Sequence, residues 1–125
     1  MRTVNIKSID SITIVVTDIA RAIRFYHEVF DLPMVNGSKT TLQVGGKQQL
    51  QFVTPDTAGL HSHGAPGNSE LALATKDPLA KTLAHLTNYA VEIDDGPVAY
   101  QGATGPATAL WLRDPDHNLI KLVCY

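Results

Sequence analysis

The order of predicted secondary-structure elements occurs twice along this chain, and this repeated order most constrains the fold. A loop rich in glycine and proline, residues 54–68, separates the two occurrences. The expected strands are 9–17, 40–44, 48–53, 70–75, 91–93, 98–100, 107–113 and 119–124, and the expected helices are 19–31 and 78–86. The halves share this order without obvious sequence identity. Because 125 residues are typical of one domain, we predict a single α+β domain over 1–125, with two βαβββ modules at about 8–54 and about 69–125.

Local signals place the helices and the faces of the strands. The first strand alternates, so Ile12 and Ile14 are expected to meet a helix, whereas Ser11 and Thr13 line the other face. We expect the two sheets to enclose a shared cleft, with each helix on an outer face. The signals for caps and turns are an N-cap at Asp18, an N-cap at Asp77 followed by Pro78 in the helix, a hairpin turn at Gly45-Gly46, and turns at 94–97 and 114–118.

Charge and hydropathy exclude several classes of protein. Ten Lys and Arg residues against twelve Asp and Glu residues give a net charge of −2, which disfavours nucleic acid as a partner. No stretch approaches the roughly 20 apolar residues of a membrane helix, and the first residues carry no apolar signal core. We therefore expect a cytoplasmic domain with no membrane partner. The single cysteine, Cys124, excludes an internal disulfide and is expected to be a buried, unreactive thiol.

Three segments carry a resemblance to a known family. They are residues 9–19 (IDSITIVVTDI), 25–32 (FYHEVFDL) and 113–122 (RDPDHNLIKL). Together they resemble the vicinal oxygen chelate superfamily, which includes glyoxalase I, bleomycin-resistance proteins, fosfomycin-resistance enzymes and extradiol dioxygenases. Residues 95–98 and 102–106 are similar to its short bacterial virulence-protein and glyoxalase-domain-5-like members. The resemblance implies a cleft-containing glyoxalase-like fold, and it implies no single reaction, because the superfamily hosts many chemistries.

The resemblance also implies four positions that hold a divalent metal in metal-dependent members. Carried onto this chain, these positions fall on Ser11, Gln51, Glu70 and Lys121. Serine is a poor ligand, and a protonated lysine cannot coordinate a metal. We therefore expect a degenerate site with no metal and no other cofactor, and a divalent metal is the alternative.

The altered positions suggest a different arrangement of the cleft. We predict an ion pair between Glu70 and Lys121, with Ser11 and Gln51 beside it, because a buried carboxylate needs a partner. This pair either stabilises the cleft or binds a polar ligand group. Thr13 and Trp111 are expected to line the same cleft. Trp111 offers a stacking surface, although packing in the core or a dimer interface is the competing interpretation.

Further candidates are a flap and the histidines. The Gly/Pro-rich stretch after residues 100–102 forms either a mobile flap over the cleft or an ordinary connecting loop. His61 and His63, two residues apart, are a metal-binding pair or exposed loop residues. His27 and His85 are expected at the surface of the helices, and His117 in a turn with a positive φ.

Three functions fit this sequence. The first is metal-free binding or sequestration of a small molecule, as in bleomycin-resistance proteins. The second is a metal-dependent lyase, isomerase or dioxygenase, such as a lactoylglutathione-lyase-like enzyme, with Glu70 as the catalytic base. The third is an accessory dimer without a small ligand. Whether the chain is an enzyme stays open, and the resemblance implies a homodimer.

Overall fold

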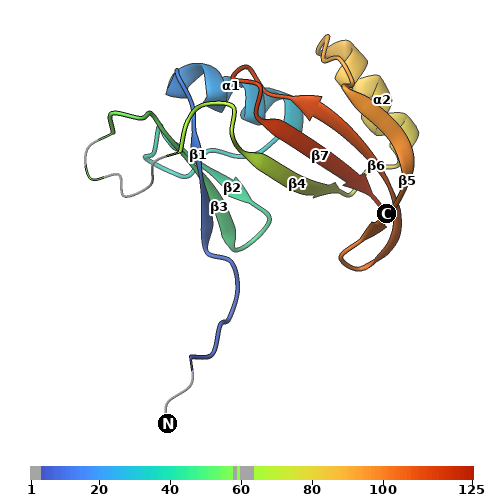
Figure 1. The fold of residues 1–125 in the computed structure, drawn as a ribbon, viewed down its shortest axis with the longest axis horizontal. Coiled ribbons are helices and arrows are strands. Elements are labelled where there is room, and N and C mark those ends of the chain that lie inside the picture. The colour runs from blue at the N-terminus through green and yellow to red at the C-terminus, as the bar shows by residue number, and fades with distance from the viewer. Residues whose placement is uncertain (1–3, 58, 60–63) are drawn as a thin grey trace.

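Two small β-sheets and two helices make up the fold (Figure 1). The computed structural model describes residues 4–57, 59 and 64–125. The elements are β1 Ser11–Val15, α1 Ile19–Phe30, β2 Thr41–Val44, β3 Gln48–Val53, β4 Glu70–Thr75, α2 Leu79–Asn88, β5 Asp95–Gly102, β6 Gly105–Arg113 and β7 Leu119–Cys124. This mixed architecture confirms the predicted α+β class. Neither helix of the described residues is long and apolar enough to cross a membrane.

Both modules follow the same path through their sheets. The strand order is β1-β3-β2 in one sheet and β4-β7-β6-β5 in the other. In each sheet the strand before the helix pairs in parallel with the last strand of the module, which the helical crossover makes possible. The first sheet is one strand smaller, because the described segment after α1 makes only an isolated bridge between Met34 and Leu42.

Helix starts agree with the sequence in one module and differ in the other. Asp18 caps α1 as predicted, because its carboxylate accepts a hydrogen bond from the Arg21 backbone N–H at 3.1 Å. In α2 the cap position belongs to Pro78, whose backbone is extended, rather than to Asp77. The Asp77 carboxylate instead pairs with Lys81 one turn later, at 3.5 Å.

The predicted strand at residues 91–93 is wrong. These residues form no regular element, and β5 begins at Asp95, inside the predicted turn 94–97. A register shift between Asp95 and Val98 interrupts the pairing with β6. Gly96 makes the shift possible, because its φ is +85° and a Cβ there would lie 2.7 Å from the Ala109 carbonyl oxygen. A bulge breaks the alternation on which a strand prediction depends.

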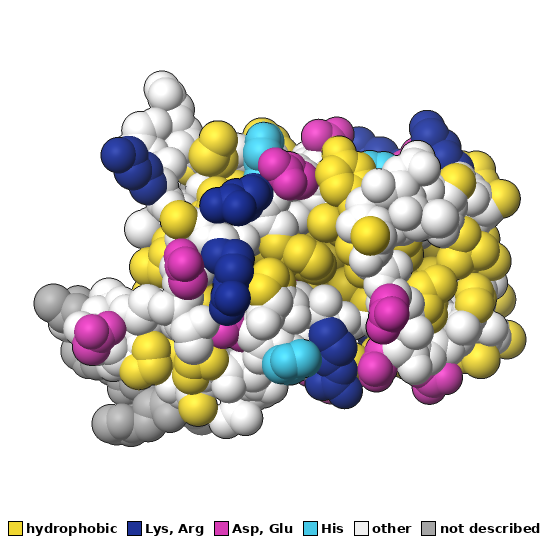
Figure 2. All heavy atoms as spheres, turned by 90° about the horizontal axis from the view of Figure 1, so that it is seen from above, with side chains coloured by type: hydrophobic (Ala, Val, Ile, Leu, Met, Phe, Trp, Pro, Cys, Tyr) yellow, Lys and Arg dark blue, Asp and Glu magenta, His cyan; other side chains and the backbone are white. Residues whose placement is uncertain are grey.

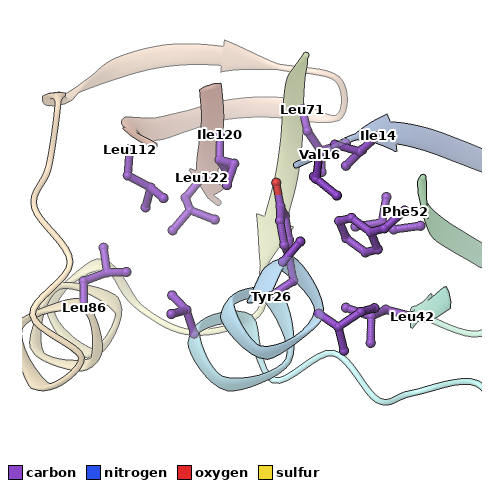
Figure 3. Packing of buried hydrophobic residues seen from close by; sticks show 14 of the residues in the cluster. Ile14, Val16, Tyr26, Leu42, Phe52, Leu71, Leu86, Leu112, Ile120 and Leu122 are labelled. Carbon is purple, nitrogen blue, oxygen red and sulfur yellow. The ribbon is translucent and has the colours of Figure 1, made fainter. Parts of the chain in front are cut away.

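One hydrophobic core unites the two modules (Figure 3). Tyr26 of α1 and Leu86 of α2 belong to the same cluster as Phe52 of the first sheet and Leu112 and Ile120 of the second. Both helices therefore lie on the same side of the strands, which corrects our expectation of helices on the outer faces of a shared cleft. The opposite sides of the sheets carry no helix.

We call these two helix-free sides the open faces. Strand alternation assigns the residues, since Leu50 and Phe52 are buried in the core and Gln51 between them points the other way. On the first sheet the open face carries Ser11, Thr13 and Gln51, and on the second it carries Ala72, Tyr100, Trp111 and Lys121.

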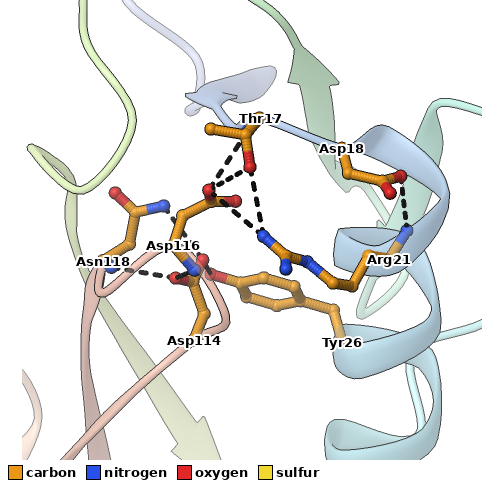
Figure 4. A network of polar contacts seen from close by, with 7 residues as sticks. All are labelled: Thr17, Asp18, Arg21, Tyr26, Asp114, Asp116 and Asn118. Carbon is orange, nitrogen blue, oxygen red and sulfur yellow. Dashed lines mark hydrogen bonds and ion pairs between the residues drawn. The ribbon is translucent and has the colours of Figure 1, made fainter.

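A buried polar network fastens α1 to the turn between β6 and β7 (Figure 4). The Tyr26 hydroxyl donates to the Asp114 carboxylate at 2.8 Å, and Asn118 donates to the same carboxylate from its backbone and its side chain. Burial, followed by the Asp114 charge, raises the pKa of the Tyr26 phenol far above its ordinary value. His117 in this turn has a φ of 67°, which confirms the predicted positive φ.

The Tyr26→Phe variant should lower the free energy of unfolding by about 1.5–3 kcal/mol, because a buried hydrogen bond to a carboxylate contributes about that much. Tyr89→Phe is the matched control, since Tyr89 is 47% exposed and should change stability little. Urea unfolding of both variants measures the difference. Equal stability of Tyr26→Phe and the unmodified protein would contradict this role.

Candidate functional site

The open face of the four-stranded sheet combines a cation with aromatic and small side chains. Lys121 of β7 lies opposite Trp111 of β6 on one side and Ala72 of β4 on the other. Tyr100 comes from β5, at the far edge of the sheet. The adjacent core positions of β7, Ile120 and Leu122, point to the helices, so alternation fixes Lys121 on the open face.

Lys121 is held by Tyr100. Its ammonium nitrogen donates to the Tyr100 hydroxyl at 2.5 Å and lies 4.4 Å from the centre of the Tyr100 ring. The Tyr100 ring meets Trp111 edge to face, with their centres 6.3 Å apart. These contacts place a half-buried positive charge between two aromatic side chains, where it is attracted to the electron-rich ring of Tyr100.

A cavity of about 200 Å³ opens beside Lys121. Its walls are Ala72, Ala74, Tyr100, Gly102, Ala103, Lys121, Val123 and Tyr125. Gly102 leaves room for the Tyr125 phenol, which a Cβ at this position would overlap. The Tyr125 hydroxyl accepts a hydrogen bond from the Thr104 backbone N–H at 3.3 Å. Hydrogen bonding from Thr104 lowers the pKa of Tyr125 below its ordinary value.

The predicted ion pair between Glu70 and Lys121 is absent. The ion pairs among the described residues join other side chains, and Lys121 bonds Tyr100 instead. The parallel register explains the difference, because it sets Glu70 opposite Leu119 and Ala72 opposite Lys121. Glu70 lies exposed at the start of β4. On the other sheet, Thr13 pairs with Gln51, and Ser11 pairs with Gln49.

Comparison with known proteins identifies the family. Residues 8–122 match the model of the Glyoxalase/Bleomycin resistance protein/Dioxygenase superfamily. The chain belongs to this superfamily. It is 31% identical to Virulence protein STM3117 of Salmonella typhimurium over 96% of this chain and 85% of that protein. The crystal structure of that virulence protein superposes with a TM-score of 0.86, at 30% identity, over 98% of this chain and 99% of that one.

One further relative and one structural neighbour complete the comparison. Glyoxalase domain-containing protein RDO1 of Mycosarcoma maydis is 29% identical over 99% of this chain and 72% of its own length. TnmS3, an antibiotic binding protein from a Streptomyces species, has a TM-score of 0.76 at 24% identity over 98% of each chain. The likeness to TnmS3 shows the fold alone.

The side chains at the superfamily's metal positions do not fit a metal ion. Lys121 presents an ammonium that already donates to Tyr100, and Ser11 and Gln51 offer only neutral oxygens. Glu70 is the one carboxylate of the four positions. No group of three or more His, Cys, Asp or Glu side chains gathers as a candidate metal site within residues 4–57, 59 and 64–125. We derive no reaction step that uses a metal.

The histidines and the suggested flap have other places in the structure. His27 and His85 are half-buried, and each has a ring nitrogen 2.7 Å from a backbone carbonyl oxygen, that of Leu32 and of Val29 respectively. His27 therefore joins α1 to the segment just after it, and His85 joins α2 to α1. Residues 100–102 belong to β5, and the suggested flap after them is a short turn followed by the start of β6 at Gly105. His61 and His63 lie outside the described residues. Cys124 is buried, as predicted.

A second and larger hollow lies on the helix side (Figure 2). It is a groove of about 740 Å³ between α1 and residues 89–94, with Phe25, Val29 and Ile93 among its walls. Figure 2 shows hydrophobic side chains across the middle of this side. None of the superfamily's metal positions lines the groove. We therefore place the candidate site on the open face beside Lys121, where the charge and the aromatic rings converge.

Gly102→Ala should displace the Tyr125 ring and break its hydrogen bond to Thr104. The pKa of Tyr125 should then rise toward the ordinary value of a phenol, because the bond that favours the ionised form is lost. Stability should change by less than about 1 kcal/mol, since Tyr125 is exposed and its ring can move. NMR titration of tyrosines labelled with carbon-13 follows the four phenols separately, and Tyr125→Phe assigns the signal. An unchanged titration would contradict the contact.

Proposed function

We propose that this chain binds a small organic molecule on its open faces without a catalytic metal. The observation that carries the proposal is the state of Lys121, whose ammonium occupies a metal position of the superfamily and is held by Tyr100 at 2.5 Å. A positive charge fixed at this point opposes the binding of a divalent cation there. We therefore infer that this surface recognises an organic ligand and does not coordinate a metal ion.

The composition of the open faces supports ligand binding. Trp111 and Tyr100 supply aromatic surface, and Lys121 supplies one polar anchor. Sites for small molecules combine apolar and aromatic walls with a few placed polar groups. Ser11, Thr13 and Gln51 add neutral hydrogen-bonding groups on the other sheet. The same fold supports an antibiotic binding protein, TnmS3, so binding of a small organic molecule is compatible with this architecture.

We also propose that two copies of the chain associate. Both open faces are turned away from the shared core, so each sheet is covered on one side only. Val98, on the open face of the edge strand β5, is 46% exposed. A second copy would cover such apolar positions and would bring the two kinds of open face together around one ligand.

Metal content tests the proposal first. The purified protein, incubated with excess nickel, zinc, manganese or ferrous iron and then desalted, should retain no stoichiometric metal by plasma mass spectrometry. A screen of small molecules should then change the fluorescence of Trp111, the only tryptophan of the chain.

The opposite result has a defined meaning. Stoichiometric metal that Glu70→Ala removes would replace this proposal with the metal-dependent lyase or dioxygenase, in which Glu70 is a ligand or a base. A metal-free protein whose Trp111 fluorescence responds to no compound would favour an accessory dimer without a small ligand.

Light scattering after size-exclusion chromatography tests the association. The expected molar mass is twice that of one chain. Val98→Lys should shift the protein toward the monomer, because a charge at a covered apolar position is costly to bury. Lys81→Glu, on the helix side, is the control and should leave the mass unchanged. A monomer at all concentrations would refute the dimer.

A further inference from the structure

We propose that the cavity beside Lys121 binds the carboxylate group of a planar organic ligand. This inference rests on the proposed function and extends it, because it names the ligand class and the anchoring atom. It starts from the hydrogen-bonding state of the Lys121 ammonium, its surroundings, and the shape of the space next to it.

The ammonium of Lys121 has unused donors. A lysine side chain carries three N–H groups, and a single hydrogen bond, to the Tyr100 hydroxyl, is formed within the described part of the chain. The ring of Tyr100 approaches the same nitrogen. Two N–H groups of the ammonium therefore have no hydrogen-bond acceptor among the described residues.

The charge of Lys121 lacks a carboxylate partner among the described residues. The ion pairs of these residues are Arg21–Asp116, Lys81–Asp77 and Arg113–Asp94. The register keeps Glu70 two residues away along β4, at an exposed strand end. Among the described residues, the partner of this half-buried cation is a phenol hydroxyl. Such a cation favours an external anion, because partial desolvation strengthens its attraction to an opposite charge.

The cavity next to this cation has space for a small anionic group. Ala72, Ala74 and Gly102 keep the walls short, and the cavity has a volume of about 200 Å³. Lys121 is the only cationic side chain in the wall. One positive charge matches a carboxylate, whereas a phosphate carries up to two charges and is typically bound by arginine forks or several donors.

The surroundings of the cavity favour a flat ligand. Trp111 pairs with Lys121 on the neighbouring strand. The rings of Trp111 and Tyr100 stand edge to face. An aromatic or similarly planar ligand packs well against such rings. The ligand class is therefore a planar monocarboxylate, with its carboxylate on Lys121 and its ring beside Tyr100, which lines the cavity and whose ring contacts Trp111.

Benzoate and benzamide test the inference, because they have nearly the same shape and differ in charge. Binding is followed by the fluorescence of Trp111 and by calorimetry. The unmodified protein should bind benzoate at least about tenfold more tightly than benzamide, as expected for a charge-assisted hydrogen bond. Lys121→Met should remove this preference while binding of benzamide persists.

Matched variants separate charge from folding. Lys81→Met removes an exposed lysine on α2, whose surface ion pair contributes little, and should keep the preference. Tyr100→Phe keeps the ring and removes the partner of the ammonium, and it should bind benzoate at least as tightly as the unmodified protein. If Lys121→Met does not fold, as judged by thermal unfolding, Lys121→Gln takes its place with the same expected loss.

The outcomes distinguish this inference from the proposed function. Equal binding of benzoate and benzamide, or a preference that survives in Lys121→Met, would overturn the carboxylate site and leave small-molecule binding intact. No binding of either probe would also overturn it. Only a further failure of every compound in the screen would overturn the proposed function itself.

Discussion

The hydrogen bond from the Tyr26 hydroxyl to the Asp114 carboxylate joins the helix of the first module to the last turn of the second. Asp114 is 3% exposed, and its carboxylate accepts hydrogen bonds from Tyr26 and from the donors of its own turn. Since Tyr26 also lies within the common hydrophobic cluster, one side chain fixes both the polar and the apolar contact between modules. Thr17 and Arg21 extend this junction, because both contact the Asp116 carboxylate of the same turn.

Placing both helices on one side leaves the other side of each sheet to be defined by strand alternation alone. On β7 this means that Ile120 and Leu122 supply the core, while Lys121 between them is available for chemistry. Neighbouring strands then add Trp111 and Ala72 at the same level of the sheet. The strand register thus brings residues that are far apart in the chain together on one face of the sheet, where they form the candidate site.

Alternation and turn chemistry explain which predictions from the sequence were confirmed. The bounds of β4 and β7 agree with the predicted strands 70–75 and 119–124, because each is a regular strand bounded by polar turns. For β5 the sequence predicted only residues 98–100, because the bulge at Gly96 breaks the pattern at its start. The predicted ion pair between Glu70 and Lys121 was wrong for another reason. Alternation shows which residues share a face, but the register of parallel strands is set by tertiary packing.

An ammonium and a metal ion make different demands on a protein. A bound metal requires several donors that converge at about 2.0–2.6 Å with defined geometry, so the loss of two ligands abolishes a site. An ammonium requires only a pocket that holds one side chain and leaves its N–H groups accessible. Tyr100 meets this need from a neighbouring part of the same sheet. In our proposal, the Lys121 ammonium therefore supplies a positive charge on the open face in place of a metal ion. Ser11 and Gln51 then do not coordinate a metal and instead form hydrogen bonds with a ligand.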